Sequence, residues 1–487
     1  MSAISAAGLR SSRRAPYVLV AAAAFYLLCL VVGPMLYEFY LSLTDARLLN
    51  IYRNQFVGLA NYAQMMADTR MLAALRITVV YTALTVGLAL VAGVAGALAV
   101  HGRFPGRSVG RVVLILPWAM PSVAAALAFT WIFNQETGVL NRVVQTMGGT
   151  PHGWLTDPDW ALAAVIAVSA WKTFPFVMLV VLAALQSIPE DLYEAARLDR
   201  ADAPNTFAAV TWPHIAPAVG VVALLLTIWA FRRFEVIWLL TEGGPLEATN
   251  TLVVDVYRAS FIQGEIGRGA ALGVVGLVFP PWSRWCTSVS RGNAIPPMPS
   301  LLSLIPRPTR LRIGPWTLLR LGIGAVLTVL AAFPLYWMLV SATHGMREMF
   351  GTNPPWLPAP QALPGLLREV FSSTPMGVWL ANSAFIAFGT AACSLLLAVP
   401  AAYALSRYRF RGRGLFGYVL FATQMLPEAL LVIPLYVIFL MLGLLNQRTG
   451  LVVANVAFAM PVAVWILKNA MDALPAEVEE QARLDGC

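Results

Sequence analysis

Long apolar runs separated by short polar loops set the pattern of this 487-residue chain. An α-helix needs about 20 apolar residues to cross the hydrocarbon core of a bilayer. On that criterion the runs predict membrane spans at 17–40, 74–100, 112–133, 160–186, 216–240, 264–282, 315–341, 379–405, 416–443 and 450–471. The pattern therefore indicates an all-α fold, a polytopic transmembrane helix bundle of about 10 spans.

The basic residues gather in loops on one side of this bundle. If the N-terminus lies in the cytoplasm, the Arg-rich loops that fall inside are 101–111, 187–215, 283–314 and 406–414. Cytoplasmic loops of helical membrane proteins carry an excess of Lys and Arg, and the first apolar run is too long for a cleaved signal peptide. We expect a multi-pass protein of the plasma or inner membrane with a cytoplasmic N-terminus.

Composition narrows the class further. Hydrophobic residues make up 59% of the chain, and the net charge of +9 arises from arginines in short loops rather than from a basic domain. That distribution argues against nucleic-acid binding. The four cysteines are scattered and form no CxxC or metal-ligand spacing, so neither disulfides nor a metal site is expected.

Two charged stretches interrupt the apolar pattern. The first charged segment, residues 187–215, reads SIPEDLYEAARLDRADAPNTFAAVTWPHI, and the second charged segment, residues 473–487, reads ALPAEVEEQARLDGC. They align without gaps at an offset of 286 residues, which places Glu194 on Glu480. A repeat of this kind indicates two related membrane modules. The predicted boundaries are 1–282 for the first module, 283–314 for a Pro- and Arg-rich cytoplasmic linker, and 315–487 for the second module.

The first charged segment has the local signals of a short amphipathic helix. Ser187 and Glu190 have the spacing of a capping box, and Pro189 suits the first turn of a helix. Ala195 and Ala196, at the centre of the helix, leave room for the close approach of a partner. A helix that lies on the membrane interface is the alternative, but the recurrence of the segment in both modules favours docking to a paired partner.

The sequence EAARLD at 194–199, with Phe207 and Pro213 downstream, resembles the EAA loop of permease subunits in binding-protein-dependent ABC importers. Further stretches are similar to the carbohydrate-uptake, maltose-type branch of that family. The first module resembles the larger permease of a maltose-type pair, and the second resembles the smaller one. The matching stretches are FVGLANY (56–62), AWKTFPF (170–176) and FRRFEVIWLLTEGGP (231–245), then AAYALSRYRFRGRG (401–414) and LPEALLVIPLY (426–436).

In that family the EAA loop is the coupling helix, which sits in a cleft of the cytoplasmic ATPase. The resemblance implies this role for Glu194, Ala195, Ala196, Asp199 and Arg200 in the first module, and for Glu480, Ala482, Asp485 and Gly486 in the second. The chain departs from the family pattern at Arg200, where a glycine is usual and a positive φ is expected. Gln481 replaces an alanine, and the second module stops inside the motif.

The resemblance also implies a type I ABC importer that works by alternating access. The chain has two lysines, Lys172 and Lys468, and neither follows a glycine, so a Walker A phosphate loop is absent. We expect a transport component rather than an enzyme, with no cofactor of its own, whose ATP and Mg are bound by a partner. The expected partners are a cytoplasmic ABC ATPase dimer, an extracytoplasmic solute-binding protein, the lipid bilayer and a sugar. The sugar class includes di- and oligosaccharides of trehalose or maltose type and glycerol phosphate.

Charged and aromatic residues inside the predicted spans are candidates for the substrate path, because a charge in a span costs about 2.5–3.5 kcal/mol on insertion scales. The candidates are Trp171, Phe174, Phe231, Arg232, Arg233, Glu235 and Glu428. Arg232 and Arg233 fall mid-span in the predicted pattern, and pairing with Glu235 inside the bundle is an equal alternative for them. Aromatic residues in membranes are more often packing or interface anchors. Arg76 and Lys172 are expected to extend toward the span ends.

Two other functions fit parts of the pattern. A secondary transporter of two pseudo-repeats, driven by an ion gradient, explains the duplicated helices but not the EAA loops. An inactive or truncated permease fusion explains why the sixth run halts at PPWSRW (280–285) and why the second module lacks its last spans. We expect two adjacent permease genes fused in one chain, with a shift of reading frame near residue 280; resequencing of the gene tests this.

Overall fold

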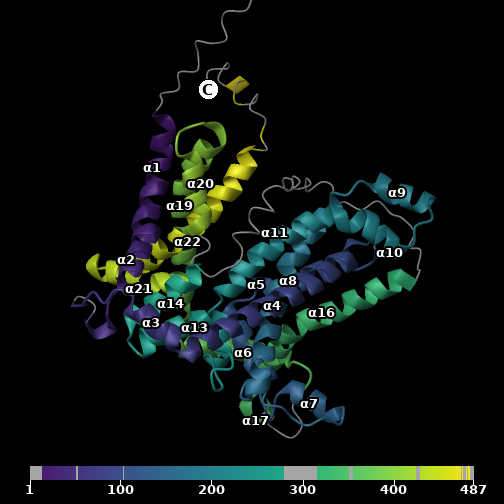
Figure 1. Cartoon of the computed structure of the whole chain (residues 1–487). Coiled ribbons are helices and arrows are strands. Elements are labelled where there is room, and N and C mark those ends of the chain that lie inside the picture. The colour runs from purple at the N-terminus through teal and green to yellow at the C-terminus, as the bar shows by residue number, and fades with distance from the viewer. Residues whose placement is uncertain are drawn as a thin grey trace, which may run out of the picture. The chain divides into compact units, whose positions relative to one another are not determined.

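The computed structural model describes residues 14–50, 53–102, 104–278, 315–349, 355–423, 428–472, 474, 479 and 481–482. Helices account for nearly all of the regular structure in these ranges (Figure 1). Within them the β-type pairing is one isolated bridge between Thr44 and Phe56. The expectation of an all-α helix bundle is therefore confirmed.

Seven helical segments among the described residues are long and apolar enough to cross a membrane. They are 15–42, which contains α1 (Ala15–Leu27) and α2 (Gly33–Ser42); α4 (Thr69–His101); α8 (Pro158–Gln186); 203–231, which contains α10 (Ala203–Thr206) and α11 (Trp212–Phe231); α16 (Pro315–Ala342); α19 (Met376–Arg407); and α22 (Arg448–Asp472). Each of these segments overlaps a predicted span, because an uninterrupted apolar run is itself the physical requirement for crossing.

The predicted span at 112–133 is not one straight helix. It consists of α5 (Arg107–Ala119) and α6 (Ser122–Ile132), which meet at an angle of 98°. Met120, between them, is extended, with φ −70° and ψ 134°. Pro121 causes this conformation, because proline lacks the N–H of a helical hydrogen bond and disfavours helical dihedrals in the residue before it.

The predicted span at 216–240 also breaks. The helix α11 ends at Phe231, and a separate short helix, α12 (Glu235–Thr241), follows after a turn. Arg232 and Arg233 therefore lie at the C-terminal end of a helix rather than in the middle of one, which corrects their predicted mid-span position. Cations are favoured there because the last carbonyls of a helix carry partial negative charge.

The remaining helices are shorter. They are α3 (Ala60–Ala67), α7 (Val139–Thr146), α9 (Glu190–Leu198), α13 (Leu252–Tyr257), α14 (Ile266–Val278), α17 (Met346–Met349), α18 (Leu363–Ser373), α20 (Arg413–Thr423) and α21 (Glu428–Met441). The helix α14 covers the start of the predicted span at 264–282, and α20 and α21 cover most of the one at 416–443. The predicted linker at 283–314 and the basic N-terminal residues before Arg14 lie outside the described residues.

The described residues form two compact units. Unit 2 comprises Gln64–Arg258 and Val278–Leu367, and its core is the pair α4 and α8. Gly93 on α4 faces Val177 on α8 so closely that any side chain at 93 would overlap it. Ala89 and Ala97, one turn before and after, are fully buried. This four-residue spacing of small residues lets the two backbones approach, and it serves helix packing.

Unit 1 comprises Met1–Ala63, Ala259–Leu277 and Arg368–Cys487. Its core is the pair α19 and α22, with α1 packed against them. The Tyr26 hydroxyl on α1 donates to the Val453 carbonyl on α22. In unit 2, α16 packs on α4 and α5. Each unit therefore contains helices from both predicted modules. The module boundaries were predicted from a sequence repeat, and they stay a prediction.

Candidate functional site

The first charged segment begins directly after α8. The Ser187 hydroxyl donates to the Ala184 carbonyl at 2.8 Å and so completes the last turn of α8. The next helix, α9, begins at Glu190 with Pro189 before it and no side-chain cap. The predicted capping box of Ser187 and Glu190 is therefore wrong, because the serine hydroxyl serves the carbonyl end of the preceding helix instead.

A tight backbone motif ends α9. The N–H of Ala201 donates to the Ala196 carbonyl at 2.9 Å, and the N–H of Arg200 donates to the Arg197 carbonyl at 3.1 Å. This pair of bonds is the Schellman motif, in which the first residue after the end of the helix, here the donor Arg200, is left-handed. Arg200 has φ 53°, so the expected positive φ is confirmed at a position where an arginine takes the place of glycine.

Two further hydrogen bonds shape the turn that follows. The Asp202 carboxylate accepts from the N–H of Asn205 at 2.9 Å and so caps α10. The Tyr193 hydroxyl, on α9, lies 3.2 Å from the Thr211 hydroxyl, where the chain enters α11. The helix α9 is therefore fixed to both neighbours, to α8 through a short link and to α11 through a side-chain bond.

The motif residues of this segment lie at the surface of unit 2. Glu194, Ala195, Asp199 and Arg200 are exposed, and Ala196 is half-buried. Leu198 is 85% exposed, so an apolar side chain stands among the charges. In Figure 1, α9 lies near one end of α8 and α7 lies near the other end. Unit 2 thus presents a short, well-defined charged helix at one end of its bundle.

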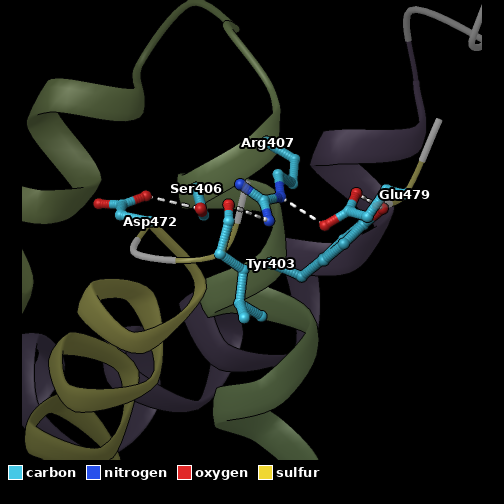
Figure 2. A network of polar contacts seen from close by, with 6 residues as sticks. Tyr403, Ser406, Arg407, Asp472 and Glu479 are labelled. Atoms are coloured by element: carbon cyan, nitrogen blue, oxygen red, sulfur yellow. Dashed lines mark hydrogen bonds and ion pairs between the residues drawn. The ribbon is translucent and has the colours of Figure 1, made fainter. Parts of the chain in front are cut away.

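The second charged segment is described only at Leu474, Glu479, Gln481 and Ala482. Glu480, Asp485 and Gly486 of the predicted coupling set lie outside the described residues. Figure 2 shows how the described part is held by the end of α19. Arg407 Nε contacts Glu479 Oε1 at 2.6 Å, and Arg407 Nη2 donates to the Leu474 carbonyl at 3.2 Å.

The cations predicted inside the spans have specific partners in unit 2. The Lys172 ammonium donates to the carbonyl of Met120, at the break between α5 and α6. The expectation that Lys172 extends to the end of its span is therefore wrong: the carbonyl exposed by the break at Pro121 is its acceptor. Arg233 Nη2 donates to the Thr173 hydroxyl at 3.2 Å. Among the described residues, Arg233 forms no ion pair with Glu235, which is exposed.

The aromatic candidates make packing contacts in unit 2, and their place in the substrate path stays a prediction. Phe174 is 4% exposed and belongs to the main apolar cluster of unit 2, and Phe231 is buried, with 7% exposed. The Trp171 indole donates to the Leu330 carbonyl on α16 at 2.9 Å, and its ring meets that of Phe129 edge-on with centroids 5.0 Å apart. Trp171 is half-buried, and aromatic rings with such contacts stabilise a helix bundle. Glu428 begins α21, and its side chain lies outside the described part of the structure.

Sequence reasoning missed an open pocket in unit 2. It has a volume of about 790 Å³ and lies beside the end of α6 and the end of α12. Polar and apolar residues line it together, and the polar ones include Asn134, Gln135, Glu136, Thr241 and Glu242. The Asn134 side chain is itself held by the N–H groups of residues 136 and 137. The TEGGP stretch at 241–245 indicates a turn in the sequence. It does not indicate that residues about 110 positions earlier line the same pocket.

Comparison with known proteins places these features in a family. Residues 70–280 match the family described as the binding-protein-dependent transport system inner membrane component. A probable ABC transporter permease of Brucella suis is 33% identical over 266 residues, which are 54% of this chain and 92% of the relative. The trehalose/maltose permease MalF of Thermococcus litoralis is 32% identical over 262 residues, 54% of this chain and 88% of the relative.

A third relative is the sulfoquinovosyl glycerol permease SmoG of Agrobacterium fabrum, 35% identical over 258 residues, 53% of this chain and 84% of the relative. Each of these matches covers about half of this chain and most of the relative. Together with the helix bundle and its seven or more apolar helices, they agree with the resemblance found in the sequence. The chain belongs to the inner-membrane permeases of carbohydrate-uptake ABC transporters.

Proposed function

We propose that this chain is the transmembrane permease of an ATP-driven, binding-protein-dependent sugar importer, and that the first charged segment couples it to a separate ATPase. The observation that carries the proposal is α9, a short exposed helix whose end is fixed by the left-handed Arg200. We expect a partner that displaces α9 to move α8 and α11 as well, because residues 187–189 connect α9 directly to the end of α8 and the Tyr193 hydroxyl contacts that of Thr211 at the start of α11.

The coupling surface consists of small and charged residues. Ala195 presents no side chain beyond its methyl group, so the backbone of a partner can approach closely, while Glu194 and Arg197 flank it with opposite charges. Such a surface fits a cleft in an ATPase dimer, with ATP and Mg bound there rather than in this chain. Glu480, Ala482, Asp485 and Gly486 take the same role in the second segment, by their sequence correspondence.

The transport cycle follows from this arrangement. Closure of the two ATPase subunits moves the charged segments and turns the bundle from inward-facing to outward-facing, and an extracytoplasmic binding protein then delivers the sugar. The named relatives transport trehalose or maltose and sulfoquinovosyl glycerol, and a glycerol 3-phosphate permease is also similar. We infer a substrate of this size and polarity, a di- or oligosaccharide or a polar glycoside.

Reconstitution tests the proposal. The chain, its cognate ATPase and its binding protein are placed in proteoliposomes, and sugar-stimulated ATP hydrolysis is measured with Glu194→Ala. We expect stimulation and sugar uptake to fall by at least tenfold, the effect of about 1.4 kcal/mol of lost coupling energy. Asp191→Ala, on the same exposed helix but outside the motif, is the matched control and keeps uptake. Unchanged uptake and ATPase binding in Glu194→Ala would rule out coupling through α9.

A secondary transporter remains the competing function from another class. The same proteoliposomes discriminate the two. An importer of the proposed kind needs ATP and is insensitive to a protonophore, whereas an ion-driven transporter stops when the gradient collapses. ATP-independent uptake by the chain alone would favour the secondary transporter.

A further inference from the structure

A polar network in unit 1 ties the cytoplasm-assigned end of α19 to the second charged segment (Figure 2). Arg407 stands at its centre. Its Nε contacts Glu479 Oε1 at 2.6 Å, and its Nη2 donates to the Leu474 carbonyl at 3.2 Å. The Tyr403 hydroxyl, one turn earlier on α19, donates to Glu479 Oε2 at 3.3 Å. Both carboxylate oxygens of Glu479 are therefore engaged by α19.

The geometry of this network differs from that of an ordinary surface ion pair. The side chains of Arg407 and Glu479 are 16% and 32% exposed, so solvent screens their attraction only in part. Charge-assisted hydrogen bonds of this length are stronger than neutral ones. One guanidinium therefore contacts two described points of the segment, the Glu479 carboxylate and the Leu474 carbonyl.

The first half of the chain holds its corresponding segment in another way. The stretches FPGR (104–107) and FRGR (410–413) correspond, since Gly106 and Gly412 have φ 84° and 91° and a helix begins directly after each. In that register Arg407 falls on His101. Glu479 falls on Tyr193 at the offset of 286 residues, and Tyr193 bonds a neutral hydroxyl, that of Thr211. We call the contact of Arg407 with Glu479 and Leu474 the ionic clamp; in the first segment Tyr193 stands at the aligned position and offers no carboxylate for it.

We propose that Arg407 is a positioning residue for coupling: its ion pair with Glu479 orients the second charged segment and transmits the movement of that segment to α19. This inference rests on the proposed function, because it assigns a task to a segment that an ATPase moves. Glu479 directly precedes Glu480, which corresponds to Glu194 of the first segment. Arg407 thus contacts the residue directly before the one that the sequence aligns with Glu194.

The test is a charge exchange in the complete reconstituted transporter. Arg407→Gln and Glu479→Gln are each expected to lower the sugar transported per ATP hydrolysed by about tenfold, from the loss of a charged hydrogen bond, with the ATPase still bound. The double variant Arg407→Glu with Glu479→Arg restores the opposite charges and is expected to recover much of the ratio. Lys468→Gln is the matched control, because Lys468 bonds Asp472 and not the charged segment.

Several outcomes overturn the inference. An unchanged transport-to-hydrolysis ratio in Arg407→Gln does so, and so does a double variant that performs no better than the single ones. If Arg407→Gln fails to assemble, Arg407→Lys is measured instead, and an unchanged ratio there, with Glu479→Gln also unchanged, counts against the clamp. Failure of the proposed function gives a different result, because then Glu194→Ala also leaves sugar uptake unchanged. If Glu194→Ala lowers uptake while Arg407→Gln leaves the transport-to-hydrolysis ratio unchanged, only the role of Arg407 is rejected.

Discussion

The two charged segments share a sequence motif, but the molecule holds them by different chemistry. The first is fixed by its own backbone, through the Schellman motif at Arg200, and by a neutral bond between Tyr193 and Thr211. The second is held at Leu474 and Glu479 by the guanidinium of Arg407. The two segments therefore share their motif residues, but the side chains of neighbouring helices that hold them differ.

The difference has a physical consequence. A neutral hydrogen bond contributes about 0.5–1.5 kcal/mol net and one to a charged group about 1.5–3 kcal/mol. The attraction between charges, unlike a bond between two hydroxyls, is also weakened by salt. We therefore expect the second segment to depend more on one side chain and on ionic strength than the first.

The largest expected effect is that of Arg407→Glu, which places a second carboxylate beside Glu479. Loss of the charged bond alone lowers the local stability of the second segment by about 1.5–3 kcal/mol. Amide exchange over residues 474–482 should accelerate by about tenfold to a hundredfold, while exchange over 190–198 stays unchanged. Equal acceleration in both segments would indicate general unfolding and would contradict a specific role of Arg407 in holding the second segment.

Arg200→Gly should tighten the first segment. An L-residue in the left-handed region costs about 1–2 kcal/mol, and glycine relieves this at some cost in unfolded-chain entropy. We expect a net gain of about 0.5–1 kcal/mol, seen as slower amide exchange in α9. Arg197→Gly, inside the helix, is the control of opposite sign, with a loss of about 1 kcal/mol. Faster exchange in Arg200→Gly would contradict a strained turn.

Tyr193→Phe removes one neutral bond and should have a smaller effect. We expect a loss of about 0.5–1 kcal/mol between α9 and the start of α11, measured by amide exchange over 203–211. The effect should be the same at low and high salt, because no charge is involved. A marked salt dependence would mean that a charged partner, rather than Thr211, holds the tyrosine.

The smallest effect is that of salt on the unmodified chain. Raising the ionic strength from 0.1 to 1 M shortens the Debye length from about 10 to 3 Å. Exchange over 474–482 should rise by less than about threefold, since the pair is partly buried, and exchange over 190–198 should not change. The same response in both segments would remove the proposed distinction.

The sequence predicted the long helices well, and it failed at their breaks. Apolar runs locate α4, α8 and α19 because crossing a membrane requires such runs. The break at Pro121 falls inside apolar sequence, with the proline as its visible signal, and the break after Phe231 coincides with Arg232 and Arg233, which the sequence analysis placed in the middle of a span. The sequence correctly predicted the positive φ of Arg200. It misassigned the Ser187 hydroxyl, which was expected to cap the start of α9 but donates to a carbonyl at the end of α8.

The anchors of the two segments could not be predicted locally. Arg407 and Glu479 are 72 residues apart, and each has charged neighbours that look equivalent in the sequence. Lys172 and Met120 are 52 residues apart, and the bond depends on a carbonyl that is free only because α5 breaks. Side-chain contacts of this kind depend on the tertiary packing, which periodicity does not contain.

The central claim is that α9 docks to an ATPase. A photo-cross-linking residue at position 195 tests this most directly, in the complete transporter in its membrane, with Val91 on the exposed face of α4 as the control position. We expect a cross-link from position 195 to the ATPase and none from position 91. Cross-links from position 195 to lipid alone would contradict it, and would identify α9 as a helix that lies on the membrane interface.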